Sequence, residues 1–171
     1  MNSVLEEQSA CGLEAKWWQS PDQKRIRYFL REPESSLAPK IVFLHATGFH
    51  SRIWLQVIEC LPECFGICCV DARGHGQSDP DEEMRYTWQQ VAEDTKGVLH
   101  TLYWERCILV GHSMGGAVAM MLASQPGPLV AKLVLLDPTI FPNWLGRLLR
   151  WTYALTGWHF SDYVKKRKNY F

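Results

Sequence analysis

The amino-acid sequence predicts an α/β domain with a doubly wound, mostly parallel sheet. The first observation is a set of short apolar runs typical of buried parallel strands, at residues 41–44, 67–70, 108–110 and 133–136. The second is that patterns of helical period separate these runs, over residues 53–61, 88–103 and 114–124. Strands that alternate with helices imply right-handed crossovers, which place helices on both faces of the sheet.

The remaining segments complete the predicted domain organisation. Residues 1–13 are predicted to form an N-terminal tail, residues 14–138 the α/β core, and residues 139–171 the beginning of a helical lid. The core opens with an antiparallel hairpin, because Ser20–Gln23 supplies the residue types of a tight turn. The two strands of this hairpin are Glu14–Gln19 and Lys24–Arg31.

Composition and charge narrow the function classes. The 171 residues are 47% hydrophobic and carry 18 basic against 18 acidic side chains, which fits one globular domain and excludes disorder along the whole chain. A formal net charge of zero lacks the excess of Lys and Arg that neutralises phosphates, so we expect no nucleic-acid partner. Glycine, histidine and serine interrupt the apolar stretch 107–123, so no membrane-spanning helix is predicted.

The six cysteines are predicted to be reduced thiols. Glu6 and Glu7 lie where the apolar part of a secretory signal would be, so we expect a cytoplasmic protein. Three cysteines share the i, i+4 spacing of one helix face: Cys60, Cys64 and Cys68. Pro62 and Gly66 interrupt such a helix, and paired C-x-x-C spacing with a histidine partner is missing, so we predict no metal site.

The strongest chemical signal is the segment Gly111–Gly116, which matches the pattern G-x-S-x-G. A strand is predicted before it and a helix after it, and in that context the pattern places a nucleophile at a sharp turn. Such a turn needs neighbours with almost no side chain two positions from the serine, and Gly111 and Gly115 meet this need. The alternative is a phosphate-binding loop, but its lysine and its wider glycine spacing are missing. We therefore predict that Ser113 is a nucleophile.

With three further segments, this pattern resembles the N-terminal part of the α/β-hydrolase-fold family of serine hydrolases. The four matching segments, in the order in which the family has them, are Leu44–Phe49, Val70–Ser78, Gly111–Gly116 and Leu133–Pro138. The resemblance implies hydrolysis of an ester or related acyl bond through an acyl-enzyme on Ser113, without a cofactor. Serine in the pattern argues against the family's dehalogenases and epoxide hydrolases, which place aspartate there.

The resemblance also implies roles for residues around the serine. Backbone N–H groups of Met114 and Thr47 would form the oxyanion hole, although Ala46 stands where the family usually has glycine and restricts positive φ. His45 is expected to be a structural residue of its loop. Asp71 and Arg73 are expected to satisfy the backbone of the loop after the second parallel strand, and each other.

The rest of the family's catalytic triad is not found in this sequence. The family's histidine follows a later strand, and none of the six histidines here does so; the expected position lies beyond Phe171. The family's acid usually follows the next strand after Leu136, and Asp137 matches only an alternative position for it. The resemblance therefore implies a C-terminally truncated hydrolase whose sheet is incomplete and ends in an apolar edge strand that favours aggregation.

The segment after Asp137 leaves two interpretations open. A predicted helix ends before Gly157 and is rich in aromatic residues, and a basic run follows at residues 165–168. We interpret it as a lid over a small hydrophobic acyl substrate and do not expect membrane-surface binding, because one short basic run is usually a solvated face. A non-catalytic binding protein that keeps the pocket is the alternative function. The sequence leaves the bond type open, from ester to thioester, lactone, carbon–carbon bond or perhydrolysis, and also the oligomeric state.

Overall fold

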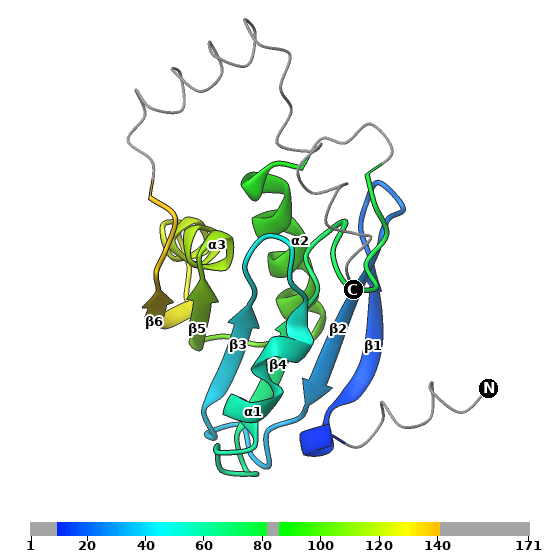
Figure 1. Ribbon diagram of the computed structural model, residues 1–171. Coiled ribbons are helices and arrows are strands. Elements are labelled where there is room, and N and C mark those ends of the chain that lie inside the picture. The colour runs from blue at the N-terminus through cyan, green and yellow to red at the C-terminus, as the bar shows by residue number, and fades with distance from the viewer. Residues whose placement is uncertain (1–9, 82–85, 141–171) are drawn as a thin grey trace, which may run out of the picture. The chain divides into compact units, whose positions relative to one another are not determined.

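The computed structural model describes residues 10–81 and 86–140. Its helices and strands all belong to the compact unit Met1–Pro138. Six strands form one sheet in the order β1-β2-β4-β3-β5-β6 (Figure 1). Their bounds are Glu14–Gln19, Arg25–Arg31, Lys40–Leu44, Gly66–Val70, Cys107–His112 and Val130–Leu136 for β1 to β6. The predicted fold class is confirmed.

The strand directions explain why the sheet is mostly parallel. β1 and β2 form the predicted antiparallel hairpin, with Glu14 opposite Leu30, and β2 also runs antiparallel to β4. The pairs β3–β4, β3–β5 and β5–β6 are all parallel. Leu44 lies opposite Val70 on one side and Gly111 on the other, so the carboxyl ends of these three strands lie at one end of the sheet. Ligand sites of α/β sheets occur at that end.

The helices agree with the predictions in position but not always in length. α2 covers Trp88–Thr101 and α3 covers Met114–Ala123, and Thr87 caps α2 by accepting a hydrogen bond from the N–H of Gln90. The predicted helix over residues 53–61 is shorter. It consists of the 3₁₀ turn η3, Ser51–Trp54, and α1, Leu55–Ile58, after which Pro62 prevents the backbone from continuing as a helix. A further 3₁₀ turn, η2, covers Ala10–Gly12.

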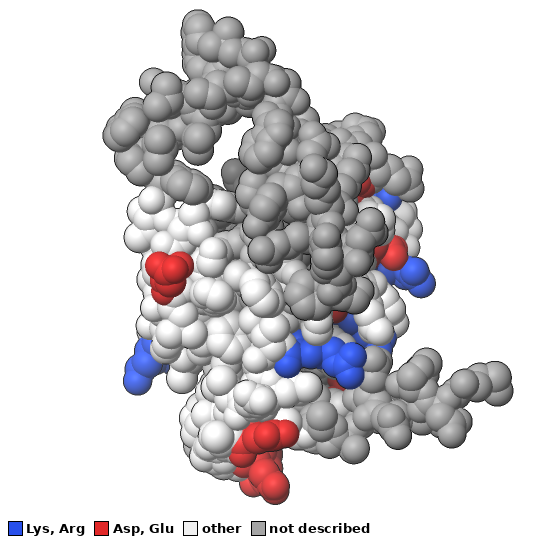
Figure 2. Space-filling view, in the orientation of Figure 1, with Lys and Arg blue, Asp and Glu red and all other residues white. Residues whose placement is uncertain are grey.

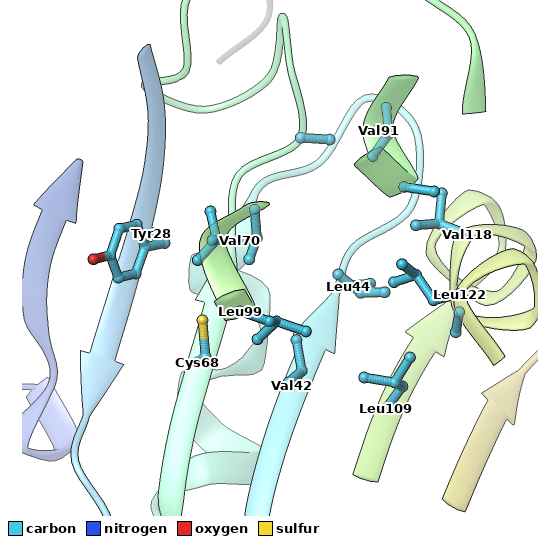
Figure 3. Packing of buried hydrophobic residues seen from close by; sticks show 14 of the residues in the cluster. Tyr28, Val42, Leu44, Cys68, Val70, Val91, Leu99, Leu109, Val118 and Leu122 are labelled. Atoms are coloured by element: carbon cyan, nitrogen blue, oxygen red, sulfur yellow. The ribbon is translucent and has the colours of Figure 1, made fainter. Parts of the chain in front are cut away.

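Two hydrophobic clusters cover the two faces of the sheet. On one face the strands pack against α2 and α3, through side chains such as Leu99 and Leu122 (Figure 3). On the other face Phe43 packs with Trp54 from η3 and Ile58 from α1. Neighbouring residues of β3 alternate between the two clusters, which explains why the parallel strands are apolar throughout. Helices therefore lie on both faces, as a doubly wound sheet requires (Figure 1).

The cysteines are free thiols, and three are buried in the sheet: Cys68, Cys69 and Cys107. Burial raises the pKa of the Cys107 thiol to about 11, so this side chain behaves as a small apolar core residue. In the view of Figure 2, basic and acidic side chains of the described residues stand in small separate groups, without an extended surface of one sign.

The strand β6 differs from the other parallel strands, because its apolar side chains are exposed. Leu133, Val134 and Leu136 are 37%, 44% and 44% exposed. β6 is the last strand of the sheet order in the described part of the chain, so the predicted apolar edge is confirmed. The predicted lid helix and the basic run that follows it lie outside the described residues. Within the described ranges, every helix is too short or too polar to cross a bilayer.

Candidate active site

The predicted nucleophile Ser113 lies at the sharp turn between β5 and α3. Its backbone has φ 52° and ψ −111°, a conformation that residues with a side chain rarely adopt. Three hydrogen bonds hold this turn. The N–H of Ser113 donates to the carbonyl of Leu136 at 3.0 Å, and the carbonyl of Ser113 accepts from the N–H of Gly116 at 3.0 Å and from the N–H of Ala117 at 3.2 Å. The strain at Ser113 is thus supported by β6 on one side and by α3 on the other.

Two glycines allow this turn to form. A Cβ atom on Gly111 would lie 2.4 Å from the carbonyl oxygen of Gly115, and one on Gly115 would lie 2.2 Å from the carbonyl oxygen of Leu44. Both contacts involve backbone, which cannot move aside as a flexible side chain can. The close approach of strand and helix that the sequence pattern requires is therefore present in the structure.

The loop after β3 carries Thr47 and lies beside this turn. Leu44 pairs with Gly111, and the position of a Cβ on Gly115 is also 2.9 Å from the carbonyl oxygen of His45. Further along the loop, the ring of Phe49 lies 6.5 Å from the ring of His112. Contacts at both ends thus place the loop that carries Thr47 at the end of the sheet where Ser113 lies.

The backbone of this loop shows why alanine is accepted at position 46, where the family usually has glycine. Positive φ occurs two residues later, at Gly48, with φ 82°, whereas Ala46 has no positive φ. The N–H of Phe49 donates to the carbonyl of Ala46 at 3.2 Å and closes a turn across this glycine. Alanine is compatible with the loop because the left-handed residue is elsewhere.

Met114, the other predicted oxyanion donor, is the first residue of α3. The N–H groups in the first turn of a helix have no partner within the helix, and the helix dipole adds positive potential there. An oxyanion beside Ser113 would meet both features. The roles of Met114 and Thr47 as donors stay predictions.

His45 is a structural residue, as predicted. The residue is 1% exposed, Nδ1 lies 2.8 Å from the carbonyl oxygen of Ala46, and Nε2 accepts a hydrogen bond from the N–H of Ala72 at 2.9 Å. These partners assign the neutral form with the proton on Nδ1. Burial lowers the pKa of His45 to about 4, because the charged ring would lose its hydration. Both nitrogens are used by the loops, so His45 is not available as a base for Ser113.

The prediction that Asp71 and Arg73 satisfy each other is wrong. The Asp71 carboxylate accepts hydrogen bonds from the N–H and hydroxyl of Ser51 and from the N–H of Gln77. Arg73 instead pairs with carboxylates from two other elements. The other part of the prediction, that these side chains support loop backbone, is confirmed for Asp71.

Arg73 is a buried cation with two acidic partners that sequence reasoning missed. Its Nε and Nη2 donate to the two oxygens of Asp94 on α2, both at 2.9 Å, and its Nη1 and Nη2 donate to Asp22 in the hairpin turn. The guanidinium holds the pKa of Asp22 well below its usual range. Asp94 is 2% exposed, and an acid on the buried face of an amphipathic helix was the only signal in the sequence that could have indicated this pair.

Asp137, which matches the family's alternative position for the triad acid, directly follows β6. Because the carbonyl of Leu136 accepts the N–H of Ser113, Asp137 stands at the strand end nearest the turn. Its own backbone has φ 43°. Its role as the triad acid stays a prediction. In residues 10–81 and 86–140 no group of three His, Cys, Asp or Glu side chains is arranged to hold a metal ion.

Comparison with known proteins identifies the family. The model of the alpha/beta hydrolase family matches residues 41–168, which include both loops and the turn at Ser113. The chain belongs to the α/β hydrolase family.

Two curated proteins similar to this chain are matched over only part of their length. The chain is 35% identical over 114 residues to the sn-1-specific diacylglycerol lipase ABHD11 of Mus musculus, a match that covers 66% of this chain and 36% of the mouse protein. It is 41% identical over 99 residues to the AB hydrolase superfamily protein YisY of Bacillus subtilis, covering 57% of this chain and 37% of YisY.

A solved α/β hydrolase from Novosphingobium aromaticivorans superimposes with a TM-score of 0.69 at 27% identity, and the match covers 80% of this chain and 48% of that one. The chain spans somewhat more than a third of the length of the two curated relatives, the mouse lipase and YisY.

Proposed function

We propose that this chain supplies the nucleophile and the oxyanion hole of a serine hydrolase that cleaves an ester or a related acyl bond. The observation that carries the proposal is the conformation of Ser113, a non-glycine residue with φ 52° at a strand-to-helix turn that two glycines make possible. Strain of this kind costs about 1–3 kcal/mol and is retained at functional sites. Membership of the α/β hydrolase family supports the same function.

In the proposed reaction, the Ser113 hydroxyl oxygen attacks the acyl carbonyl carbon, and its proton passes to a histidine base. The N–H groups of Met114 and Thr47 donate to the oxyanion of the tetrahedral intermediate, beside the positive end of α3. The leaving alcohol takes the proton, an acyl-enzyme forms on Ser113, and water then releases the acid by the same steps. No step requires a cofactor or a metal.

The base is proposed to come from sequence that this chain does not include. His45 uses both ring nitrogens within the loops, so it cannot take the serine proton. The relatives have further sequence that the match does not cover, since the chain spans 36% of the mouse lipase. We propose that the 171 residues are the N-terminal part of a longer hydrolase, in which residues from 139 onward begin a lid.

The proposed substrate is a hydrophobic ester. Two similar proteins support this choice by their names: a diacylglycerol lipase, and a solved membrane phospholipase A that superimposes with a TM-score of 0.71 at 26% identity. Esters, and not other acyl bonds, are favoured for the same reason.

A non-catalytic binding protein is the second candidate function. The buried and fully bonded His45 favours it, because a serine without a base is a poor nucleophile. Such a protein would keep the fold and bind an acyl compound at the same sheet end without forming a covalent intermediate.

Labelling with a fluorophosphonate distinguishes the two functions. We expect the wild-type chain to gain the mass of one phosphonyl group, and the variant Ser113→Ala to gain none. Intact-mass spectrometry measures the adduct, and peptide mapping locates it. Equal labelling of both proteins would contradict Ser113 as the nucleophile, and no labelling of either after prolonged exposure would favour the binding protein.

A further inference from the structure

The loop that carries Thr47 is anchored at both of its ends to two adjacent residues of another loop. At its start, Nε2 of His45 accepts the N–H of Ala72 at 2.9 Å. At its end, the N–H of Ser51 donates to Oδ1 of Asp71 at 2.7 Å, and the Ser51 hydroxyl donates to the same oxygen. The residues between these anchors contain no helix or strand, so the anchors limit how far the loop can move.

All the groups that form these anchors are buried. His45, Ser51 and Asp71 are 1%, 2% and 2% exposed. Hydrogen bonds to a buried carboxylate are stronger than those between neutral groups, and an unpaired partner there would be costly. Water does not compete for these bonds, which makes the anchors effective at holding a fixed geometry.

The loop that provides the anchors is itself fixed from three directions. Oδ2 of Asp71 accepts the N–H of Gln77 at 3.0 Å, and the carbonyl of Asp71 accepts the hydroxyl of Ser78 at 2.7 Å. A Cβ on Gly76 would lie 2.0 Å from Oδ2 of Asp71, so only glycine lets this turn close around the carboxylate. Arg73 ties the same turn to α2 and to the β1–β2 hairpin.

We propose that His45, Ser51 and Asp71 are positioning residues that hold the Thr47 N–H at the oxyanion hole. The inference rests on the function proposed above and adds to it the groups that preorganise one donor. Oxyanion stabilisation depends on donors that are already in place when charge develops, so a loop that samples other positions loses part of it. None of the three side chains is required to touch the substrate.

Two buried serines of the chain give a matched pair of variants. Ser51→Ala removes the hydroxyl bond to the side chain of Asp71. Ser78→Ala removes a hydroxyl bond to the backbone of the same residue, and also the acceptor of the Arg27 N–H. The two serines are 2% and 7% exposed, so both variants lose one buried hydroxyl. Only Ser51 lies at the end of the loop that carries Thr47.

Amide hydrogen exchange of the 171-residue chain tests the anchors without requiring catalysis. We expect exchange in a peptide covering residues 46–50 to be roughly tenfold faster in Ser51→Ala than in wild type. The change in Ser78→Ala should be much smaller, because the Asp71 carboxylate there keeps its bonds to Ser51 and Gln77. The peptide covering β3 gives the internal reference for global unfolding. Asp71→Asn, which replaces one acceptor oxygen by an amide, is the second variant and should show the same local increase. Exchange at residues 46–50 that is unchanged in Ser51→Ala and Asp71→Asn, or that rises equally in Ser78→Ala, would overturn the inference.

Fluorophosphonate labelling of Ser113 in the same proteins tests the consequence for reactivity. The labelling rate should fall roughly three- to tenfold in Ser51→Ala and stay within twofold of wild type in Ser78→Ala. Failure of the wild-type chain to label contradicts the proposed function, whereas normal labelling of Ser51→Ala together with faster exchange contradicts only the role of the loop at the oxyanion hole.

Discussion

The turn at Ser113 and the turn at residues 71–78 stand at the same end of the sheet but are held by different forces. The first depends on the absence of side-chain atoms, because strand, helix and neighbouring loop come into backbone contact at Gly111 and Gly115. The second depends on bonds to buried charges, Asp71 and Arg73. The comparison teaches that the first turn should be sensitive to added atoms and the second to lost charge or protonation.

The largest effect is expected where atoms are added to the first turn. In Gly115→Ala the new Cβ would lie 2.2 Å from the Leu44 carbonyl oxygen, and β3 and α3 must separate to accept it. We expect the free energy of unfolding to fall by about 3 kcal/mol or more, with loss of labelling at Ser113. Urea denaturation followed by circular dichroism measures the change.

Gly48→Ala is the control for this substitution. Gly48 has φ 82°, but the space around its Cβ position is open, so only backbone strain opposes alanine. A loss of about 1 kcal/mol is expected. If the two variants lose equal stability, volume is not what fixes the turn at Ser113.

A smaller effect is expected when charge is removed from the second turn. Asp94→Asn keeps the size of the side chain but removes a carboxylate that bonds Arg73 through two nitrogens, and Arg73 is 1% exposed. Removing one partner of a buried ion pair costs about 3–5 kcal/mol, and the remaining partner Asp22 should bring the loss to about 2 kcal/mol. Urea denaturation at pH 7 gives the value.

Asp79→Asn provides the exposed counterpart. Asp79 pairs with Arg25 at 3.0 Å, but the two side chains are 26% and 61% exposed, so water screens the pair. We expect little change in stability. A loss as large as that of Asp94→Asn would show that burial is not what distinguishes the two ion pairs.

Protonation of His45 is expected to destabilise the folded protein at acidic pH. Its pKa is about 4 in the folded protein and about 6.5 in the unfolded chain, so between these values the unfolded chain binds more protons. Stability is therefore fully present above pH 6.5 and is lost as the pH falls toward 4. The slope approaches about 1.4 kcal/mol per pH unit within this window.

Urea denaturation at several pH values from 6.5 to 4.5 measures this slope. His45→Asn keeps a donor in place of Nδ1 but does not titrate, so its stability should be lower at pH 7 and should vary less with pH. Equal slopes in wild type and variant would mean that another group causes the pH dependence.

Part of the site could be predicted from local sequence. The Ser113 turn follows from the order strand, G-x-S-x-G, helix, because each requirement involves residues within a few positions of each other. The structural role of His45 was also predicted. The partners of Asp71 and Arg73 could not be, since they stand 20, 21 and 51 positions away, at Ser51, Asp94 and Asp22.

The sequence by itself determined the fold class of this protein, the hairpin, and the position of the turn at Ser113. Periodicity of apolar residues and the placement of glycines are local properties, so they can be read without knowing which distant segments meet. Only the tertiary structure decided which charges pair and which loop supports Thr47. The reason is that a buried carboxylate or guanidinium bonds to whatever donors and acceptors packing brings to it, and sheet order β1-β2-β4-β3-β5-β6 brings the hairpin turn, α2 and the loop after β3 to the same turn.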